Sequence, residues 1–196
     1  MNKIIAITGG IGSGKSTALK IIEKWGYKSF SADKTYKELL EEESFIREVS
    51  SAMGIAPIVQ NGRLSLDKSE ISRLVFNDKA MLERLNSITH PKIMSAMLEN
   101  AKACDGLAFC EVPLLFEGGF EKLFDCIFII MRRDEKRFFD ASVRDGKSVE
   151  QIKQIAKNQF DYAKITENAH TFIIYNDGDE IALAEKIRVA IDKIKA

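Results

Sequence analysis

A run of glycines and hydroxyl side chains near the start of the chain has the spacing of a phosphate-binding loop. Residues 8–17 read TGGIGSGKST, in which four residues separate Gly9 from Gly14-Lys15-Ser16. This is the Walker A pattern, whose glycines let successive backbone N–H groups surround a phosphate. An apolar run precedes the motif and a helical pattern follows it, as the motif requires. The sequence therefore predicts a nucleotide site.

Backbone and side chains of this loop are expected to have different roles. Lys15 should reach the β- and γ-phosphates of ATP, and Ser16 should ligate Mg²⁺. The other reading, a glycine-rich turn without a nucleotide, leaves the flanking strand and helix unexplained. The expected nucleotide contacts are Gly10, Ile11, Gly12, Ser13, Gly14, Lys15, Ser16 and Thr17.

A carboxylate follows the second apolar run of the chain. Asp33 comes directly after residues 27–32. A carboxylate there could accept the proton of an attacking hydroxyl or help to hold Mg²⁺. It could equally be the N-cap of the helix predicted over 34–40. The spacing alone leaves both roles open.

Basic side chains gather after a later apolar run, 126–131. A charged run is usually a solvated helix face. In a phosphate-binding fold, however, guanidinium groups at a strand end could stabilise charge on a transferred phosphoryl group. The cluster consists of Arg132, Arg133, Lys136, Arg137 and Arg144.

Short apolar runs predict the elements that must position these residues. Most of the runs do not alternate with polar residues, which is typical of a parallel sheet covered on both faces. Helical patterns lie between them, including 16–25 and 179–195. The sequence therefore predicts an α/β fold, a P-loop core with a five-stranded parallel sheet. The expected strands are 3–8, 27–32, 107–112, 126–131 and 171–175.

Two long charged stretches interrupt the alternation of strands and helices. Both are mostly helical in pattern, with a loop near 57–62, and both follow a strand end, where open α/β sheets bind ligands. We therefore expect one to hold a substrate and the other to act as a lid. The prediction is a single P-loop kinase domain with a core of 1–32, 104–131 and 168–196, a substrate-binding insertion of 33–103 and a lid of 132–167.

Composition argues against several other classes of protein. The 196 residues include 29 basic and 29 acidic side chains, and this zero net charge does not favour a nucleic-acid binder. No apolar run approaches the roughly 20 residues that span a bilayer, and the N-terminal apolar run is too short for a signal peptide. Cys104, Cys110 and Cys126 lack metal-site spacing and are expected to be reduced thiols. We expect a cytoplasmic monomer or weak homo-oligomer, with no nucleic-acid or membrane partner.

The phosphate-binding loop alone does not choose among nucleotide-binding proteins. A GTPase should carry Asn-Lys-x-Asp, and the nearest string, at 77–80, reads NDKA. A motor ATPase is usually larger and oligomeric. The short chain with helical insertions favours a kinase of the nucleoside-monophosphate-kinase type. Another small-molecule P-loop kinase, or a nucleotide-binding module without transfer activity, remains an alternative.

Further motifs follow the loop in a fixed order along almost the whole chain. They are SAD at 31–33, His90-Pro91, PLLFE at 113–117, RDG at 144–146, Gln159 and NDG at 176–178. In this order and nearly this spacing they resemble the dephospho-coenzyme A kinase family. The resemblance implies transfer of the ATP γ-phosphate to the ribose 3′-hydroxyl of dephospho-coenzyme A, with Mg²⁺ as cofactor.

The resemblance also implies roles for particular residues. Asp33 matches the second acid of the family's Asp-Ala-Asp segment, the base for the 3′-hydroxyl, whereas Ser31 departs from the first acid. Thr8 matches the head of the loop and is an expected substrate contact. His90 could contact substrate, or could bond the backbone at a tight helix start.

Residues at the later strand ends have two readings each. Glu111 ends a strand where an acid could orient a Mg²⁺-bound water or contact the acceptor ribose, and Glu117 is the alternative acid. Leu115 could wall the substrate pocket or pack in the core. Asn176 matches the family's Asn-x-Gly, where adenine would stack, but Asn-Asp-Gly is also a strong turn signal.

The lid departs from the family at one position. The family usually carries an arginine four residues before the one that matches Arg144, and this chain has Asp140 there. Arg137, one helical turn earlier, could reach the same space, and Arg144 could act alone. Arg137 and Arg144 are therefore the catalytic candidates of the lid. Lys164 matches a commonly basic position and is a further candidate to contact phosphate.

Overall fold

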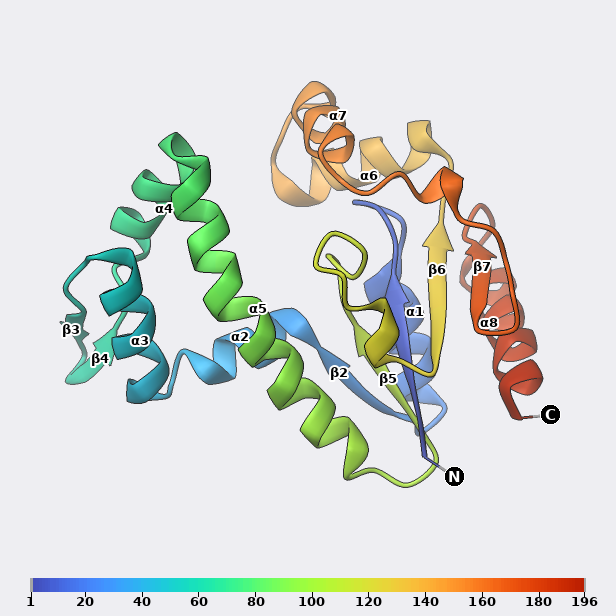
Figure 1. Cartoon of the computed structure of the whole chain (residues 1–196). Helices are drawn as coiled ribbons and strands as arrows, with labels where there is room; N and C mark the ends of the chain where they lie inside the picture. The colour runs from blue at the N-terminus through green and yellow to red at the C-terminus, as the bar shows by residue number, and fades with distance from the viewer. Residues whose placement is uncertain (1, 196) are drawn as a thin grey trace. The chain divides into compact units, whose positions relative to one another are not determined.

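The computed structural model describes residues 2–195 of the chain (Figure 1). It divides into two compact units, residues 1–30 with 101–196 and residues 31–100. The second unit corresponds closely to the expected insertion, 33–103. Whether core, insertion and lid act as a single kinase domain stays a prediction.

A five-stranded sheet, in the order β2-β5-β1-β6-β7, forms the centre of the first unit. β1 pairs in parallel with β5 and β6, and β6 pairs in parallel with β7. The predicted α/β fold is therefore confirmed. Each strand falls on a predicted apolar run, although Pro113 ends β5 early because proline cannot donate to a ladder. The strands are β1 (Lys3–Thr8), β2 (Lys28–Ser31), β5 (Leu107–Glu111), β6 (Cys126–Met131) and β7 (Thr171–Tyr175).

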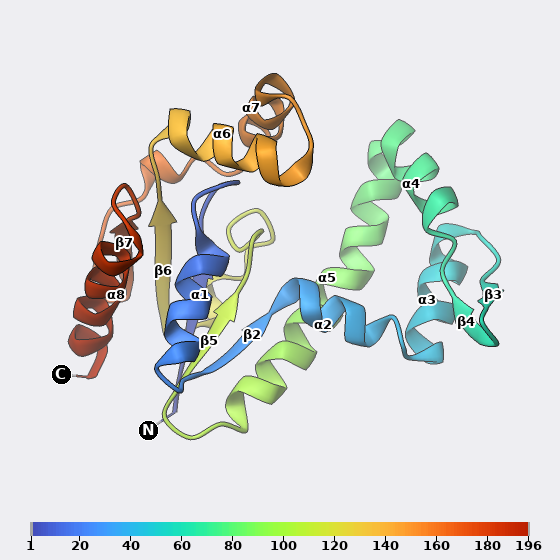
Figure 2. The ribbon, with the colours of Figure 1, turned by 180° about the vertical axis from the view of Figure 1, so that it is seen from behind.

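Two helices pack with this sheet to form the main core, as Figure 2 shows from behind. They are α1 (Lys15–Lys24) and α8 (Glu180–Lys195). Ile22 of α1 and Ile187 of α8 are completely buried against strand residues such as Phe128. Each such burial contributes about 1.5–3 kcal/mol relative to exposure. The core therefore holds the start of α1 rigidly beside the end of β1.

The second unit is a helical assembly that contains a small hairpin. We expected a loop near 57–62, and this was wrong, because the chain forms two short antiparallel strands there. Asn61 and Gly62 both have positive φ angles, 53° and 75°, as a two-residue hairpin turn requires. The elements are α2 (Ala32–Leu39), α3 (Glu43–Met53), β3 (Ile58–Gln60), β4 (Arg63–Ser65), α4 (Lys68–Asn77) and α5 (Lys79–Lys102).

The predicted lid is formed by α6 (Asp134–Asp145) and α7 (Val149–Lys157), which lie beyond the carboxyl end of β6 in Figure 1. They share a small apolar core, in which Phe138, Ala141 and Ile152 are buried. A capping box between Ser148 and Gln151 starts α7. The lid segment is thus a folded helical pair with its own core.

Two single-turn helices complete the first unit, η1 (Glu121–Leu123) and η2 (Tyr162–Lys164). Among the residues that the structure describes, no helix combines the length and apolar character needed to cross a membrane.

Candidate active site

The phosphate-binding loop joins β1 to α1 at the carboxyl end of the sheet. Gly12 and Gly14 have φ angles of 71° and 99°, which L side chains rarely adopt. A Cβ at Gly12 would lie 2.2 Å from the carbonyl oxygen of Arg137, and one at Gly14 would lie 2.2 Å from Nδ2 of Asn176. Both positions require glycine because neighbouring elements approach the loop backbone closely.

Lys15 stands at the first position of α1 and turns back over the loop. Its Nζ donates to the carbonyl oxygens of Gly9 at 2.8 Å and Gly10 at 3.1 Å. The ammonium group is therefore already placed at the loop, where phosphate oxygens could replace these carbonyls as acceptors.

Ser16 and Glu111 bring two oxygen groups together beside the loop. The Ser16 hydroxyl donates to Oε1 of Glu111 at 3.0 Å, which joins the start of α1 to the end of β5. A hydroxyl and a carboxylate suit Mg²⁺, which keeps several waters and binds substrate phosphates as well. No group of three or more His, Cys, Asp or Glu residues that could hold a metal occurs within residues 2–195. The pair therefore fits a Mg²⁺ site that phosphates complete.

Glu117, the alternative acid, has a different contact. Its Oε1 accepts a hydrogen bond from the backbone N–H of Phe160 at 2.8 Å. The ring of Phe160 stacks on Phe116, with 4.7 Å between ring centroids. Leu115, which precedes Phe116 in the PLLFE turn, is completely buried. This burial favours the core-packing reading of Leu115, and its contact with substrate stays a prediction.

Thr8 lies at the end of β1, where its hydroxyl meets a buried tyrosine. Thr8 Oγ1 and the Tyr162 hydroxyl are 3.2 Å apart, and Thr8 is completely buried. Burial raises the pKa of Tyr162 to about 12, and the Glu117 carboxylate adds to the rise, although the bond to Thr8 opposes it. The phenol therefore stays neutral, and Thr8 connects the end of β1 to the segment that follows α7. Its expected contact with substrate stays a prediction.

Asn176 connects the end of β7 to the phosphate-binding loop. Its Nδ2 donates to the carbonyl oxygen of Ser13 at 2.9 Å, and its backbone N–H donates to the carbonyl oxygen of Met131 at 2.7 Å. The side chain thus shapes the loop directly, a role that the turn signal did not predict. The expected contact with adenine stays a prediction.

Arg137 already lies against the phosphate-binding loop. Its Nη1 donates to the carbonyl oxygen of Ile11 at 3.3 Å, and its Nε donates to Oδ1 of Asp134 at 2.7 Å. The side chain is only 17% exposed, and the guanidinium group lies over the Phe138 ring. The Arg137 side chain is therefore held against the loop, and its role at the phosphates stays a prediction.

Arg144 is turned toward its neighbour in the chain. It donates from Nε and Nη2 to the two carboxylate oxygens of Asp145, at 2.7 and 2.9 Å. That bond raises the pKa of Arg144, and Glu111 acts in the same direction. The Arg144 side chain is 62% exposed, and its catalytic role stays a prediction.

Asp140, the departure from the family, has a partner that the sequence did not reveal. Its Oδ2 lies 2.7 Å from Nη2 of Arg132, whose side chain is 15% exposed. Nη1 of Arg132 is 3.5 Å from the carbonyl oxygen of Gly12, and its buried Nε has no hydrogen-bond partner among the described residues. Arg132 therefore belongs to the site. The available signal was its position directly after β6.

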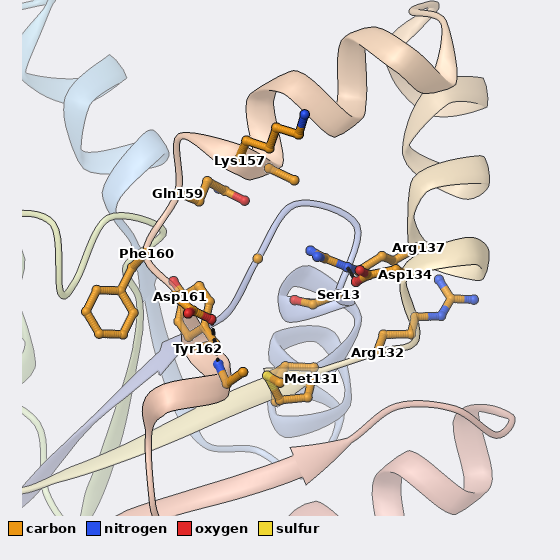
Figure 3. A pocket seen from close by; sticks show the side chains of 14 residues that line it. Ser13, Met131, Arg132, Asp134, Arg137, Lys157, Gln159, Phe160, Asp161 and Tyr162 are labelled. Atoms are coloured by element: carbon orange, nitrogen blue, oxygen red, sulfur yellow. Dashed lines mark hydrogen bonds and ion pairs between the residues drawn. The ribbon is translucent and has the colours of Figure 1, made fainter.

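A cavity of about 430 Å³ lies between the loop, the end of β6 and the lid segment (Figure 3). Arg132 and Arg137 lie on one side of it, and Lys157 and Gln159 on the other. The Ser13 hydroxyl, which also lines it, is buried without a partner among the described residues. Asp134 and Asp161 also line this cavity. A cavity of this size with several hydrogen-bond donors suits part of a polar ligand such as a nucleotide.

Asp33 belongs to the second unit and lies in the first turn of α2. The helix begins at Ala32 with Ser31 as its N-cap residue, so the reading of Asp33 as the N-cap was wrong. The exposed Asp33 lines a cavity of about 400 Å³. Its role as a base stays a prediction. The other lining residues are Tyr36, Lys37, Leu40, Leu66, Lys68, Ile71 and Ser72.

His90 lies within the long helix α5, also in the second unit. The idea of a tight helix start was wrong, because α5 continues through Pro91 to Lys102. Burial lowers the pKa of His90, so the imidazole is neutral near pH 7. Its contact with substrate stays a prediction.

Comparisons with known proteins match almost the whole chain. A family model described as dephospho-CoA kinase matches residues 3–181. A dephospho-CoA kinase from Fusobacterium nucleatum is 34% identical over 178 residues, which covers 90% of this chain and 91% of that protein.

Two solved structures are similar over nearly the whole chain. A Thermus thermophilus protein has a TM-score of 0.81 at 29% identity and covers 99% of this chain and 98% of its own. A dephospho-CoA kinase from Campylobacter jejuni has a TM-score of 0.69 at 28% identity, with the same coverage. The family model over residues 3–181 and the relative at 34% identity show that the chain belongs to the dephospho-CoA kinase family.

Proposed function

We propose that this protein transfers the γ-phosphate of ATP to the ribose 3′-hydroxyl of dephospho-coenzyme A, giving coenzyme A and ADP. The observation that carries the proposal is the arrangement of Lys15 and Ser16 at the phosphate-binding loop of the first unit. Lys15 lies over its carbonyls, and Ser16 bonds Glu111. Membership in the dephospho-CoA kinase family supplies the acceptor.

The residues of the site support this transfer in distinct ways. Loop N–H groups and Lys15 bind the phosphates, and Arg137 lies where it could stabilise charge on the transferred group. Ser16 and Glu111 would hold Mg²⁺, which screens charge on the phosphates when bound.

Asp33 is proposed as the base that accepts the proton of the 3′-hydroxyl. It follows β2 by two residues, and its carboxyl group is exposed in a cavity with Lys37 and Lys68. These lysines could attract an anionic acceptor. We also propose that His90 contacts this acceptor.

The decisive experiment is a coupled ATP assay with dephospho-coenzyme A. Phosphorus NMR of the product should locate the new phosphate on the 3′-oxygen. Parallel reactions with nucleosides and nucleoside monophosphates test another small-molecule kinase, and faster transfer to one of these would contradict the proposal. ATP binding without transfer to any acceptor would instead indicate a nucleotide-binding module.

We further propose that the protein works in the cytoplasm as a monomer or weak homo-oligomer, without nucleic acid or membrane. The zero net charge supports the absence of a polyanion partner. Sedimentation velocity at several concentrations tests the oligomeric state, and a stable dimer at low concentration would contradict it.

A further inference from the structure

One residue of the phosphate-binding loop is held by the lid through three different contacts. The Ile11 side chain packs against the apolar core that α6 and α7 share. Its backbone N–H donates to Oε1 of Gln159 at 2.8 Å. Its carbonyl oxygen accepts from Nη1 of Arg137 at 3.3 Å. All polar and apolar groups of Ile11 therefore engage the lid segment.

The two backbone contacts come from opposite ends of the lid. Arg137 lies in the first turn of α6, and Gln159 follows the last residue of α7, Lys157, by two positions. The neighbouring Gly12 also packs closely, since a Cβ there would lie 2.2 Å from the Arg137 carbonyl oxygen. Any displacement of α6 and α7 must consequently displace Ile11 or break these contacts.

Movement at Ile11 has a direct consequence for phosphate binding. Backbone N–H groups of such a loop are its phosphate donors, and they point correctly only in one loop conformation. We propose that Ile11 couples the lid to the phosphate-binding loop, so that Ile11 and Gln159 are positioning residues for ATP. This inference rests on the proposed function only in assuming that the loop takes ATP.

Hydrogen exchange of the full-length protein tests the coupling without any acceptor. The probe is AMP-PNP, a non-hydrolysable ATP analogue, added at saturation. In the wild type it should slow amide exchange in α6 and α7 as well as in the loop. In the Ile11→Ala variant, the loop should still respond but the lid response should be reduced, because the side-chain packing is lost while the backbone bonds to Gln159 and Arg137 remain. The matched control is Val143→Ala, which removes a side chain of α6 that is 69% exposed.

Kinetics provide a second measurement that a merely structural role would not reproduce. Gln159→Met removes the acceptor for the Ile11 N–H and leaves the Ile11 side chain in place. It should raise KM for ATP about three- to tenfold, the loss expected for one hydrogen bond, with KM for the acceptor unchanged. Val143→Ala, at an exposed position of α6 outside the site, should retain near wild-type KM values for both substrates.

The possible outcomes separate this inference from the proposed function. An undiminished lid response to AMP-PNP in Ile11→Ala would overturn the coupling, and so would equal effects of Gln159→Met on both KM values. If Ile11→Ala unfolds the lid before nucleotide is added, the exchange response of Gln159→Met decides in its place. Absence of transfer to dephospho-coenzyme A would contradict the proposed function and leave the AMP-PNP result standing.

Discussion

The cationic side chains of the site have partners within the protein, and a nucleotide would replace those of Lys15. Lys15 donates to loop carbonyls, Arg137 to Ile11 and Asp134, and Arg144 to Asp145. The bonds of Lys15 and Arg137 hold these two cations against the loop. Because carbonyls are weaker acceptors than phosphate oxygens, exchange of Lys15 from carbonyl to phosphate is favourable.

Lys15 is the residue whose loss should affect turnover most. We expect Lys15→Ala to lower kcat at least about 100-fold, because an ammonium group aimed at developing charge contributes several kcal/mol. The coupled ATP assay measures this effect. Lys20→Ala, an exposed lysine on the same helix, is the control. Near-normal activity of Lys15→Ala would remove the phosphate-binding role from this loop.

Asp33→Asn separates chemistry from folding at the proposed base. We expect kcat to fall by about 100-fold or more, because the amide cannot accept the proton. Loss of a charge in the first helical turn should change stability by only about 0.3–1 kcal/mol. Thermal unfolding and kcat are measured together, with Glu38→Gln on the same helix as the control. An unchanged kcat would leave Asp33 with a local role in α2.

Two of the arginines near the start of the lid, Arg137 and Arg133, should differ in their effect on activity. Arg137 is 17% exposed and bonds the loop, whereas the Arg133 side chain is 83% exposed and pairs with Asp177. We therefore expect Arg137→Ala to reduce kcat/KM for ATP about tenfold or more, and Arg133→Ala to have a small effect. Equal and small effects would show that Arg137 does not replace the missing arginine at position 140.

At the scale of elements, the segment after α7 connects three parts of the first unit. The Gln159 side chain accepts a hydrogen bond from the backbone of the phosphate-binding loop. The backbone N–H of Phe160 donates to the PLLFE turn, and its ring stacks on the same turn. The Tyr162 hydroxyl lies within hydrogen-bond distance of Thr8 at the end of β1. The lid is therefore attached at its carboxyl end to the loop and to the turn after β5. Tight attachment at these points explains how a helical pair can transmit its position to the loop.

The ion pair between Asp140 and Arg132 attaches α6 to the end of β6. We expect Asp140→Ala to destabilise the protein by about 1 kcal/mol, because it leaves a largely buried guanidinium group without its carboxylate while Asp140 itself is half-exposed. Urea denaturation measures the change. Glu135→Ala, an exposed acid of the same helix, is the control. A loss no larger than that of the control would show that the pair is merely a surface contact.

Two buried, weakly acidic side chains, the Cys110 thiol and the Tyr162 phenol, should make the free energy of unfolding fall at alkaline pH. Burial raises the pKa of Cys110 from 9.0 to about 12 and that of Tyr162 from 10.0 to about 12. Groups whose pKa is raised on folding stabilise the native state below their unfolded pKa, and this stabilisation is lost as pH rises through the folded pKa. The free energy of unfolding should therefore fall between about pH 9 and 12.

Cys110→Ala isolates the thiol's share of this dependence. Between about pH 8 and pH 10.5, we expect the wild type to lose about 2 kcal/mol more than the variant, because only the unfolded thiol ionises over this range. Urea denaturation at both pH values measures the difference, in which the cavity left by the substitution cancels. Parallel pH dependences would show that Cys110 ionises equally in both states.

The phosphate-binding loop and the strands of the sheet can be predicted from the amino-acid sequence alone. Both are local patterns: glycine spacing sets the loop, and apolar runs set the strands of a sheet covered on both faces. The hairpin at Asn61-Gly62 was equally local and could have been predicted from its turn residues.

The contacts that hold the phosphate-binding loop, by contrast, join residues far apart in the chain. Gln159 bonds Ile11 across 148 positions, Tyr162 meets Thr8 across 154, and Asn176 bonds Ser13 across 163. The Arg132–Asp140 pair depends on where β6 ends relative to α6. No periodicity in the chain specifies these contacts, because they depend on how the sheet and the lid helices pack and on which side chains that packing brings within hydrogen-bond distance.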